Sequence, residues 1–205
     1  MIRLIITMIL GYALGCVQWG FILGKLNGID IRDYGSGNSG ATNILRVLGK
    51  KASLITFLGD ALKGVIIVTV ARFLVCPHIA MNPQAVMMLA GLSAVLGHDF
   101  PVHMGFKGGK GVSTTGGVMF AINPLLTMIM LAIFIITVAI TRYVSLGSCL
   151  LMVSIPILSV IFYSFNLPMV IMGCILGGLS IWRHRANIGR LLNGTESKIG
   201  EKVER

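Results

Sequence analysis

The stretch VSTTGGVMFAINPLLTMIMLAIFIITVAI, from Val112 to Ile140, decides the fold, because the number of membrane spans depends on how it is divided. A spanning helix needs roughly 20 apolar residues, and this run is longer than one span requires. Asn123-Pro124 in its middle is a turn signal. We therefore expect two spans, 112–122 and 124–140. The first is short and needs help from neighbouring helices or a locally thinner bilayer.

The composition of the whole chain is that of an integral membrane protein. Of its 205 residues, 55% are hydrophobic and 12% are charged, against about 25% charged in soluble domains. Further apolar runs lie at 4–24, 52–76, 84–97, 147–165 and 167–182. We expect an all-α fold of seven transmembrane helices in a single domain, 1–205. GxxxG spacings at Gly11/Gly15, Gly20/Gly24 and Gly173/Gly177 suit close helix packing, or occur by chance in a Gly-rich chain.

The N-terminus resembles a signal peptide or lipobox, but its apolar run continues past Cys16 to Leu23, so we expect an uncleaved first span. The four cysteines lie far apart, which predicts small apolar residues and neither a disulfide framework nor a metal site.

Positive charge sets the expected orientation. The net charge is +10, and in a membrane protein this indicates cytoplasmic loops, so we expect no nucleic acid partner. The basic residues gather in three segments, each of which belongs in the cytoplasm by the positive-inside rule. The N-terminus is then outside and the C-terminus inside. The three groups are Lys25, Arg32, Arg46, Lys50 and Lys51; Lys107 and Lys110; and Arg183, Arg185, Arg190, Lys198, Lys202 and Arg205.

The segment GSGNSGATN, from Gly35 to Asn43, matches the dinucleotide fingerprint G-x-G-x-x-G. A charged stretch, LNGIDIRDY, precedes it instead of a hydrophobic strand, so a dinucleotide site is not expected. Gly-rich backbone can point N–H groups at an anion. Ser36, Gly37, Asn38, Thr42 and Asn43 are therefore candidate phosphate contacts, and Arg46 adds a fixed charge. The alternative is a flexible loop.

Two further polar segments predict phosphate chemistry. GHDFPVHMGFKGGKGVST is a Gly/Lys-rich loop that opens a helix, and helix N-termini favour anions. It is not a Walker A loop, and its His98 and His103 are more often structural than titrating. In WRHRANIGRLLNGTE, His184 and Asn187 share a helix face. Arg185 and Arg190 suit phosphates or lipid headgroups there, or simply mark the cytoplasmic end of a span.

Charged residues inside apolar runs are costly unless paired. Asp60 and Lys63 stand three apart in LGDALKGV, so they are either a structural ion pair or catalytic. The turn RYVSLGS brings Arg142 and Ser145 to the same membrane face. There is no acidic cluster, so a magnesium-dependent phosphotransferase site is not expected. There is also no H-x4-D acyltransferase pair.

Three motifs together resemble the bacterial acyl-phosphate:glycerol-3-phosphate acyltransferases, the PlsY family. They are GSGNSGATN with Arg46, GHDFPV with KGGKGV, and HRANIGRLLNGTE. They follow in order over nearly the whole chain, and Asp60, Lys63 and Gly64 fit as well. Ser39 stands where the family often has Pro.

The resemblance implies transfer of a fatty acyl group from acyl phosphate to the 1-hydroxyl of sn-glycerol 3-phosphate. The products are lysophosphatidic acid and phosphate, in the first step of phospholipid synthesis. The resemblance also implies that the reaction needs no cofactor and no metal. It places the protein among the lipids of the bacterial inner membrane, with its active site facing the cytoplasm. The base is either His184 or the donor phosphate. The alternative function is a small transporter of anions or phosphate esters.

The same resemblance assigns site residues by position. The catalytic set is Ser36, Arg46, Lys107, Ser145, His184 and Asn187. The phosphate-loop set is Gly108, Gly109, Lys110 and Gly111, and the supporting residues are Asp60, Lys63 and Glu196.

Overall fold

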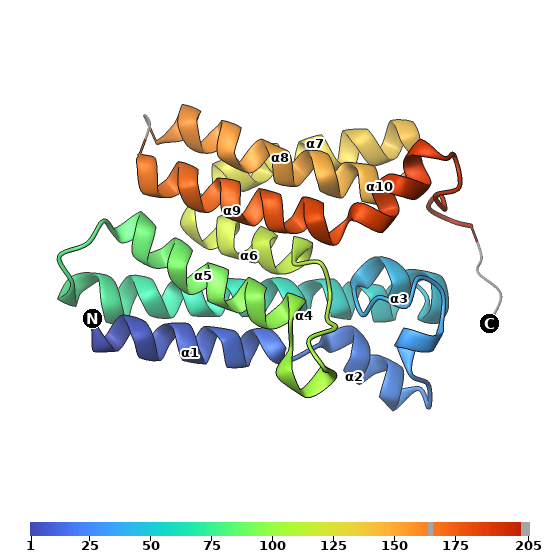
Figure 1. Cartoon of the computed structure of the whole chain (residues 1–205), viewed down its shortest axis with the longest axis horizontal. Coiled ribbons are helices and arrows are strands. Elements are labelled where there is room, and N and C mark those ends of the chain that lie inside the picture. The colour runs from blue at the N-terminus through green and yellow to red at the C-terminus, as the bar shows by residue number, and fades with distance from the viewer. Residues whose placement is uncertain (164–165, 202–205) are drawn as a thin grey trace.

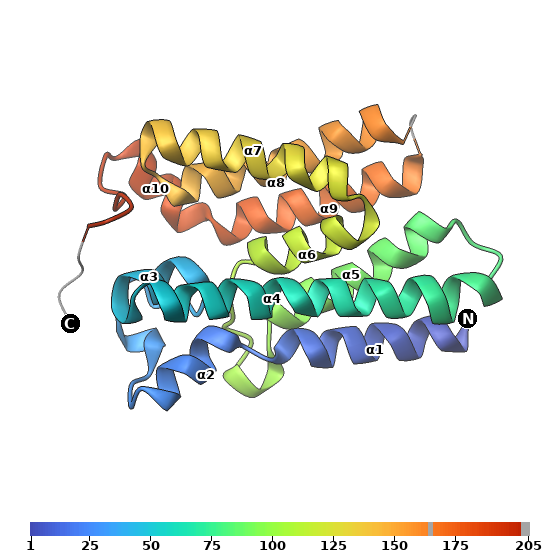
Figure 2. The ribbon, with the colours of Figure 1, turned by 180° about the vertical axis from the view of Figure 1, so that it is seen from behind.

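The computed structural model describes residues 1–163 and 166–201, and these are helical without any strand. Figure 1 shows an elongated bundle. One layer holds α1, α2, α4 and α5, another holds α7, α8 and α9, and α6 lies between them (Figures 1 and 2). The elements are α1 (Ile2–Cys16), α2 (Trp19–Leu26), η1 (Ile31–Asp33), α3 (Ala41–Leu48), α4 (Lys50–Val70), η2 (Ala71–Val75), η3 (Cys76–His78), α5 (Pro83–Asp99), η4 (Val102–Met104), α6 (Val112–Ile122), α7 (Pro124–Thr141), α8 (Val144–Phe162), α9 (Leu167–Arg183) and α10 (Arg185–Leu192).

Within residues 1–163 and 166–201, five segments are long and apolar enough to cross a membrane: Ile2–Leu26, Lys50–His78, Pro83–Met104, Pro124–Thr141 and Val144–Phe162. A sixth is reached if α9 and α10, which are bent by 60°, count as one span. The 11 residues of α6 fall below this length. The expected all-α membrane architecture is therefore confirmed, while the count of seven spans stays a prediction.

The predicted break at Asn123-Pro124 is confirmed. The end of α6 is at Ile122, and α7 begins at Pro124. The Asn123 side-chain oxygen accepts a hydrogen bond from the Leu126 amide at 3.0 Å, which caps α7. Asn82 and Asn166 cap α5 and α9 in the same way. An Asn before an early Pro thus starts three of the long helices, because it satisfies one of the free amides of the first turn.

The short α6 receives the support that its length requires. Thr114, Val118 and Met119 are fully or almost fully buried. A Cβ added at Gly117 would lie 1.9 Å from the carbonyl oxygen of Ala61, so α4 and α6 are in backbone contact. At the end of α6, the Arg72 guanidinium donates to the Ala121 and Ile122 carbonyls. These carbonyls have no helical partner of their own, so Arg72 satisfies them.

The first apolar run, expected to be continuous over 4–24, is broken at Val17 and Gln18. Both residues are extended and separate α1 from α2. The Lys63 ammonium group donates to the carbonyls of Gly15 at 3.1 Å and Val17 at 2.7 Å. An unpaired carbonyl in apolar surroundings costs several kcal/mol, so this buried lysine stabilises the break. Gln18 is 2% exposed and donates to the His98 carbonyl at 2.9 Å.

Two of the three GxxxG pairs pack helices together. A Cβ at Gly15 would lie 2.2 Å from the Ala94 carbonyl oxygen, which places α1 directly against α5. Gly173/Gly177 faces α8. The pair Gly20/Gly24 instead faces the segment between α2 and α3. The four cysteines are unpaired, in agreement with the sequence.

Candidate functional site

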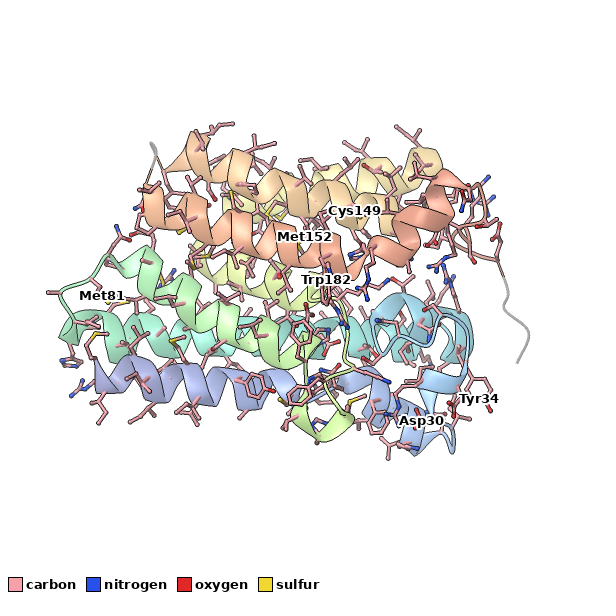
Figure 3. All side chains as sticks on the ribbon, in the orientation of Figure 1. Asp30, Tyr34, Met81, Cys149, Met152 and Trp182 are labelled. Carbon is pink, nitrogen blue, oxygen red and sulfur yellow. The ribbon has the colours of Figure 1, made fainter. Side chains whose placement is uncertain are left out.

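A cavity of about 400 Å³ lies at the end of the bundle that holds α3 and α10. The labelled residues Asp30 and Tyr34 mark this end in Figure 3, and Met81 marks the opposite one. The cavity joins the three polar motifs, which are far apart in the sequence. Its polar lining includes Ser36, Asn38, Thr42, Asn43, Arg46, Asp60, His98, Lys110, Gly111, Ser145, His184, Asn187 and Glu196.

One wall of the cavity is apolar. Leu54 and Phe57 from α4 and Phe134 and Val138 from α7 contribute to it. Leu54 and Phe57 are also exposed on the outside of the bundle. The cavity can therefore hold a polar group among the motifs while an attached apolar chain lies along this wall and reaches lipid.

The segment Gly35–Asn43 is an ordered turn leading into α3. The buried Asn43 side chain accepts from the Ser36 amide at 2.8 Å and donates to the Tyr34 carbonyl at 3.0 Å. Asn38 accepts from the Gly40 amide at 2.9 Å. The flexible-loop alternative does not fit these bonds. Gly37 lies outside the cavity lining, at a φ of 68° that favours glycine.

The loop before α6 does not present all of its predicted contacts to the cavity. The Gly108 and Gly109 amides donate to the Asp99 and His98 carbonyls at 3.1 and 3.0 Å. Their own carbonyls accept from Arg183. Both glycines therefore have their backbone groups engaged, and neither lines the cavity. Neither glycine has a free backbone N–H left for the phosphate binding that was predicted for them.

The two lysines of the same loop differ in position. Lys107 is exposed and lies outside the cavity lining, although the family resemblance implied a catalytic role for it. Lys110 lines the cavity, and its ammonium group donates to the Asn187 amide oxygen. Burial lowers the pKa of Lys110 to about 8.

Asn187 connects this lysine to the segment after α10. Its amide donates to one Glu196 carboxylate oxygen at 2.7 Å, and Arg190 donates to the other at 2.7 Å. Burial opposes ionisation of Glu196, but the hydrogen bonds from Asn187 and Arg190 outweigh it, so the Glu196 pKa lies below its ordinary value. The predicted supporting residue is thus an ionised anchor for Asn187.

His184 follows α9 and is buried at the cavity wall. Its Nδ1 lies 2.8 Å from the Ser180 carbonyl oxygen. A carbonyl only accepts, so the Nδ1 atom carries the proton and Nε2 holds the lone pair of the neutral ring. Burial, together with the charge of Lys110, lowers the His184 pKa to about 4. The imidazole is therefore neutral near pH 7.

Ser145 and Arg46 also belong to the polar lining. Ser145 lies in the first turn of α8, and its buried hydroxyl has no hydrogen-bond partner within the described residues. Arg46 on α3 donates to the Ser197 carbonyl at 3.3 Å. An unpartnered hydroxyl facing a cavity is available to a ligand.

Asp60 and Lys63 form a buried ion pair at 2.9 Å, and both side chains are 2% exposed. Lys63 also lies 3.0 Å from His98 Nδ1. Sequence reasoning treated His98 as a loop residue, but it lines the cavity beside Asp60, whereas His103 is exposed and outside it. Ile199 also lines the cavity, and no local pattern in the sequence signals this.

A family model described as glycerol-3-phosphate acyltransferase matches residues 5–194. A glycerol-3-phosphate acyltransferase of Thermoanaerobacter pseudethanolicus is 46% identical over 201 residues, covering 98% of both chains. One from Clostridioides difficile is also 46% identical, covering 98% of this chain and 97% of that protein. The crystal structure of PlsY (YgiH), an integral membrane glycerol 3-phosphate acyltransferase, in its glycerol 3-phosphate form has a TM-score of 0.88, 39% identity and 96% coverage of each chain. Its lysophosphatidic acid form has a TM-score of 0.85 and 38% identity, with 96% of this chain and 95% of that chain covered.

Proposed function

This chain belongs to the glycerol-3-phosphate acyltransferase family, and we propose that it takes its acyl group from an acyl phosphate and transfers it to the 1-hydroxyl of sn-glycerol 3-phosphate. The products are lysophosphatidic acid and inorganic phosphate. The cavity supports this donor because it is polar around the motifs and apolar between α4 and α7. The family membership decides against the transporter alternative.

The phosphate groups of both substrates bind at the polar end of the cavity. The first residues of α3 and α6 both line it, so two helix N-termini and their free amides face the same space. Arg46 and Lys110 supply positive charge there. Ser36, Asn38 and Thr42 contribute further donors. The acyl chain lies along Leu54 and Phe57.

Acyl transfer proceeds by direct attack of the substrate hydroxyl. The hydroxyl oxygen forms a bond to the acyl carbonyl carbon, the bond from that carbon to the phosphate oxygen breaks, and phosphate leaves with the electron pair. Ser145 and Asn187 donate to the oxyanion that develops. The proton goes to the donor phosphate. His184 Nε2 accepts a hydrogen bond from the 2-hydroxyl of glycerol 3-phosphate and so orients that substrate. Binding both substrates side by side supplies much of the acceleration.

We place the active site at the cytoplasmic face of a bacterial cell membrane, with α1, α4, α5, α6, α7, α8 and α9 as seven spans. The start of α1 and the end of α10 lie at opposite ends of the bundle, which suits an odd number of spans (Figure 1). The exposed cations Lys50 and Lys51 begin α4 at the cavity end, as the positive-inside rule requires.

The observation that carries this proposal is the single cavity in which all three motifs meet beside an apolar wall. It is tested by incubating the purified protein in proteoliposomes with synthetic acyl phosphate and glycerol 3-phosphate, without divalent metal. Lysophosphatidic acid and phosphate are expected in equal amounts. With acyl-CoA as donor, no product is expected. Arg46→Ala should weaken the binding of phosphorylated substrates by about 1.5–3 kcal/mol, the free energy of a hydrogen bond to a charged group, and should raise their KM accordingly. Product from acyl-CoA alone would refute the proposed donor.

A further inference from the structure

The segment Thr195–Glu201, which we call the C-terminal strap, follows α10 and contributes Glu196 and Ile199 to the cavity lining. Glu196 anchors its start through Asn187 and Arg190. Near its end, the Lys198 amide donates to the Glu201 carboxylate at 2.8 Å. The Lys198 ammonium also lies 5.6 Å from the centre of the Tyr143 ring, within the range of a cation–π contact.

Arg142, in the turn between α7 and α8, holds the far part of the strap with two hydrogen bonds. Its carbonyl accepts from the Ile199 amide at 2.8 Å, and its guanidinium donates to the Ile199 carbonyl at 3.0 Å. Arg142 ends α7 with a left-handed φ of 64°, a conformation that favours glycine. Glycine would end the helix here with less strain, so ending α7 does not explain an arginine at this position. The hydrogen bonds of Arg142 to the strap do explain it.

The strap also connects the two layers of the bundle. The Arg46 guanidinium on α3 donates to the Ser197 carbonyl. Otherwise α3 packs mainly on α2, η1 and α4. Ile199 lines the cavity and is 37% exposed, so its side chain lies at the edge of the cavity, between it and solvent.

We propose that Arg142 is a positioning residue for acyl transfer, because it holds the C-terminal strap, and with it Ile199, across the open side of the cavity. This rests on the proposed acyl-phosphate donor. Acyl phosphate can also react with water: the water oxygen bonds to the acyl carbonyl carbon, phosphate leaves, and the products are a fatty acid and phosphate. The strap reduces the access of bulk water and so favours transfer to the glycerol hydroxyl.

The first experiment measures how the acyl group is divided between glycerol 3-phosphate and water. Arg142→Gly removes the guanidinium and keeps the left-handed backbone, so α7 still ends normally. Its ratio of fatty acid to lysophosphatidic acid should rise roughly tenfold, as expected when a charge-assisted hydrogen bond is lost. Ile199→Gly should raise the same ratio. Lys51→Ala, which removes an exposed cation outside the cavity at the same end of the bundle, should leave it unchanged.

The second experiment does not depend on the donor. Ile199→Cys is placed in a protein with Cys16, Cys76, Cys149 and Cys174 replaced by Ala, and its alkylation rate is followed in detergent with and without Arg142→Gly. Faster alkylation with Arg142→Gly is expected. Equal alkylation rates, or an unchanged product ratio in an active Arg142→Gly enzyme, overturn the strap proposal. If the wild-type protein makes no lysophosphatidic acid from acyl phosphate, the proposed donor fails instead, and the alkylation result still decides the position of the strap.

Discussion

Lys110 donates a hydrogen bond from its ammonium group to the side-chain oxygen of Asn187, and this bond joins the second motif to the third across the cavity. It turns the Asn187 amide so that its nitrogen donates to Glu196 at 2.7 Å. The lysine is therefore held at the cavity by neighbours from another part of the chain, whereas Lys107 is exposed.

This difference predicts that the two lysines of the KGGKG segment have unequal effects. Lys110→Ala should weaken the binding of phosphorylated substrates by about 1.5–3 kcal/mol, because a charge-assisted contact is lost. Lys107→Ala should leave KM and kcat nearly unchanged. Initial rates over a range of glycerol 3-phosphate and acyl phosphate concentrations provide the comparison. A large effect of Lys107→Ala with none for Lys110→Ala would reverse the assignment made from the structure.

The pH dependence of activity follows from the same lysine. Burial lowers the Lys110 pKa to about 8, so the side chain is charged below that pH and loses its proton above it. The charge that attracts phosphate is lost as pH rises, and kcat/KM, which reports the free enzyme, should fall above about pH 8. Substrate phosphates are already dianionic there. Lys110→Arg keeps its charge at these pH values and should remove the decline. A decline that persists in Lys110→Arg belongs to another group.

The sequence was sufficient to predict those features of the fold that depend on residues next to each other in the chain. The break between α6 and α7 follows from Asn123-Pro124, because a side-chain cap and a fixed backbone angle act locally. The convergence of the motifs followed from their expected position on one membrane face, since cations sort to the cytoplasm.

Features set by distant partners were not predictable from the sequence. The break at Val17 depends on Lys63 in another helix, which satisfies its carbonyl. The choice of Lys110 over Lys107 depends on the engagement of Gly108 and Gly109 with His98, Asp99 and Arg183. Only the folded arrangement brings these groups together.

The ion pair of Asp60 and Lys63 should be measurable as stability. Lys63→Met leaves the carboxylate of Asp60 buried without its 2.9 Å partner, and breaking such a pair costs about 3–5 kcal/mol. The Tm of the Lys63→Met protein in detergent should therefore lie clearly below that of the wild type. Asp60→Asn combined with Lys63→Met should recover part of the loss. If the double variant regains Tm but stays inactive, the pair also takes part in the reaction. If Lys63→Met leaves Tm unchanged, the pair does not stabilise the fold.

The proposed orientation is testable by labelling in intact cells. Lys51 and Met81 are exposed and lie at opposite ends of the bundle, so each can carry a single reporter cysteine. In a background without native cysteines, an impermeant maleimide should label Met81→Cys, and should label Lys51→Cys only after the cells are opened. The reverse pattern would invert the proposed topology.

The last prediction separates two roles for His184. Its Nδ1 proton is committed to the Ser180 carbonyl, so Nε2 acts only as an acceptor. It is free either to take the proton of the attacking hydroxyl or to accept a hydrogen bond from the 2-hydroxyl of glycerol 3-phosphate. If Nε2 is the general base, His184→Ala should lower kcat by roughly 10²–10⁴. Activity of the wild-type enzyme should then fall only as pH drops through about 4, where the buried ring becomes protonated. If His184 instead orients glycerol 3-phosphate, His184→Gln keeps a hydrogen-bond acceptor and should retain much of the activity with an unchanged pH profile. We expect the second result, because the donor phosphate is a better proton acceptor near neutral pH than an imidazole with so low a pKa. Measurement of kcat against pH for the wild type and both variants decides the question. An acidic limb near pH 4 in the wild type that is absent from the residual activity of His184→Ala, together with an inactive His184→Gln, would establish the histidine as the base.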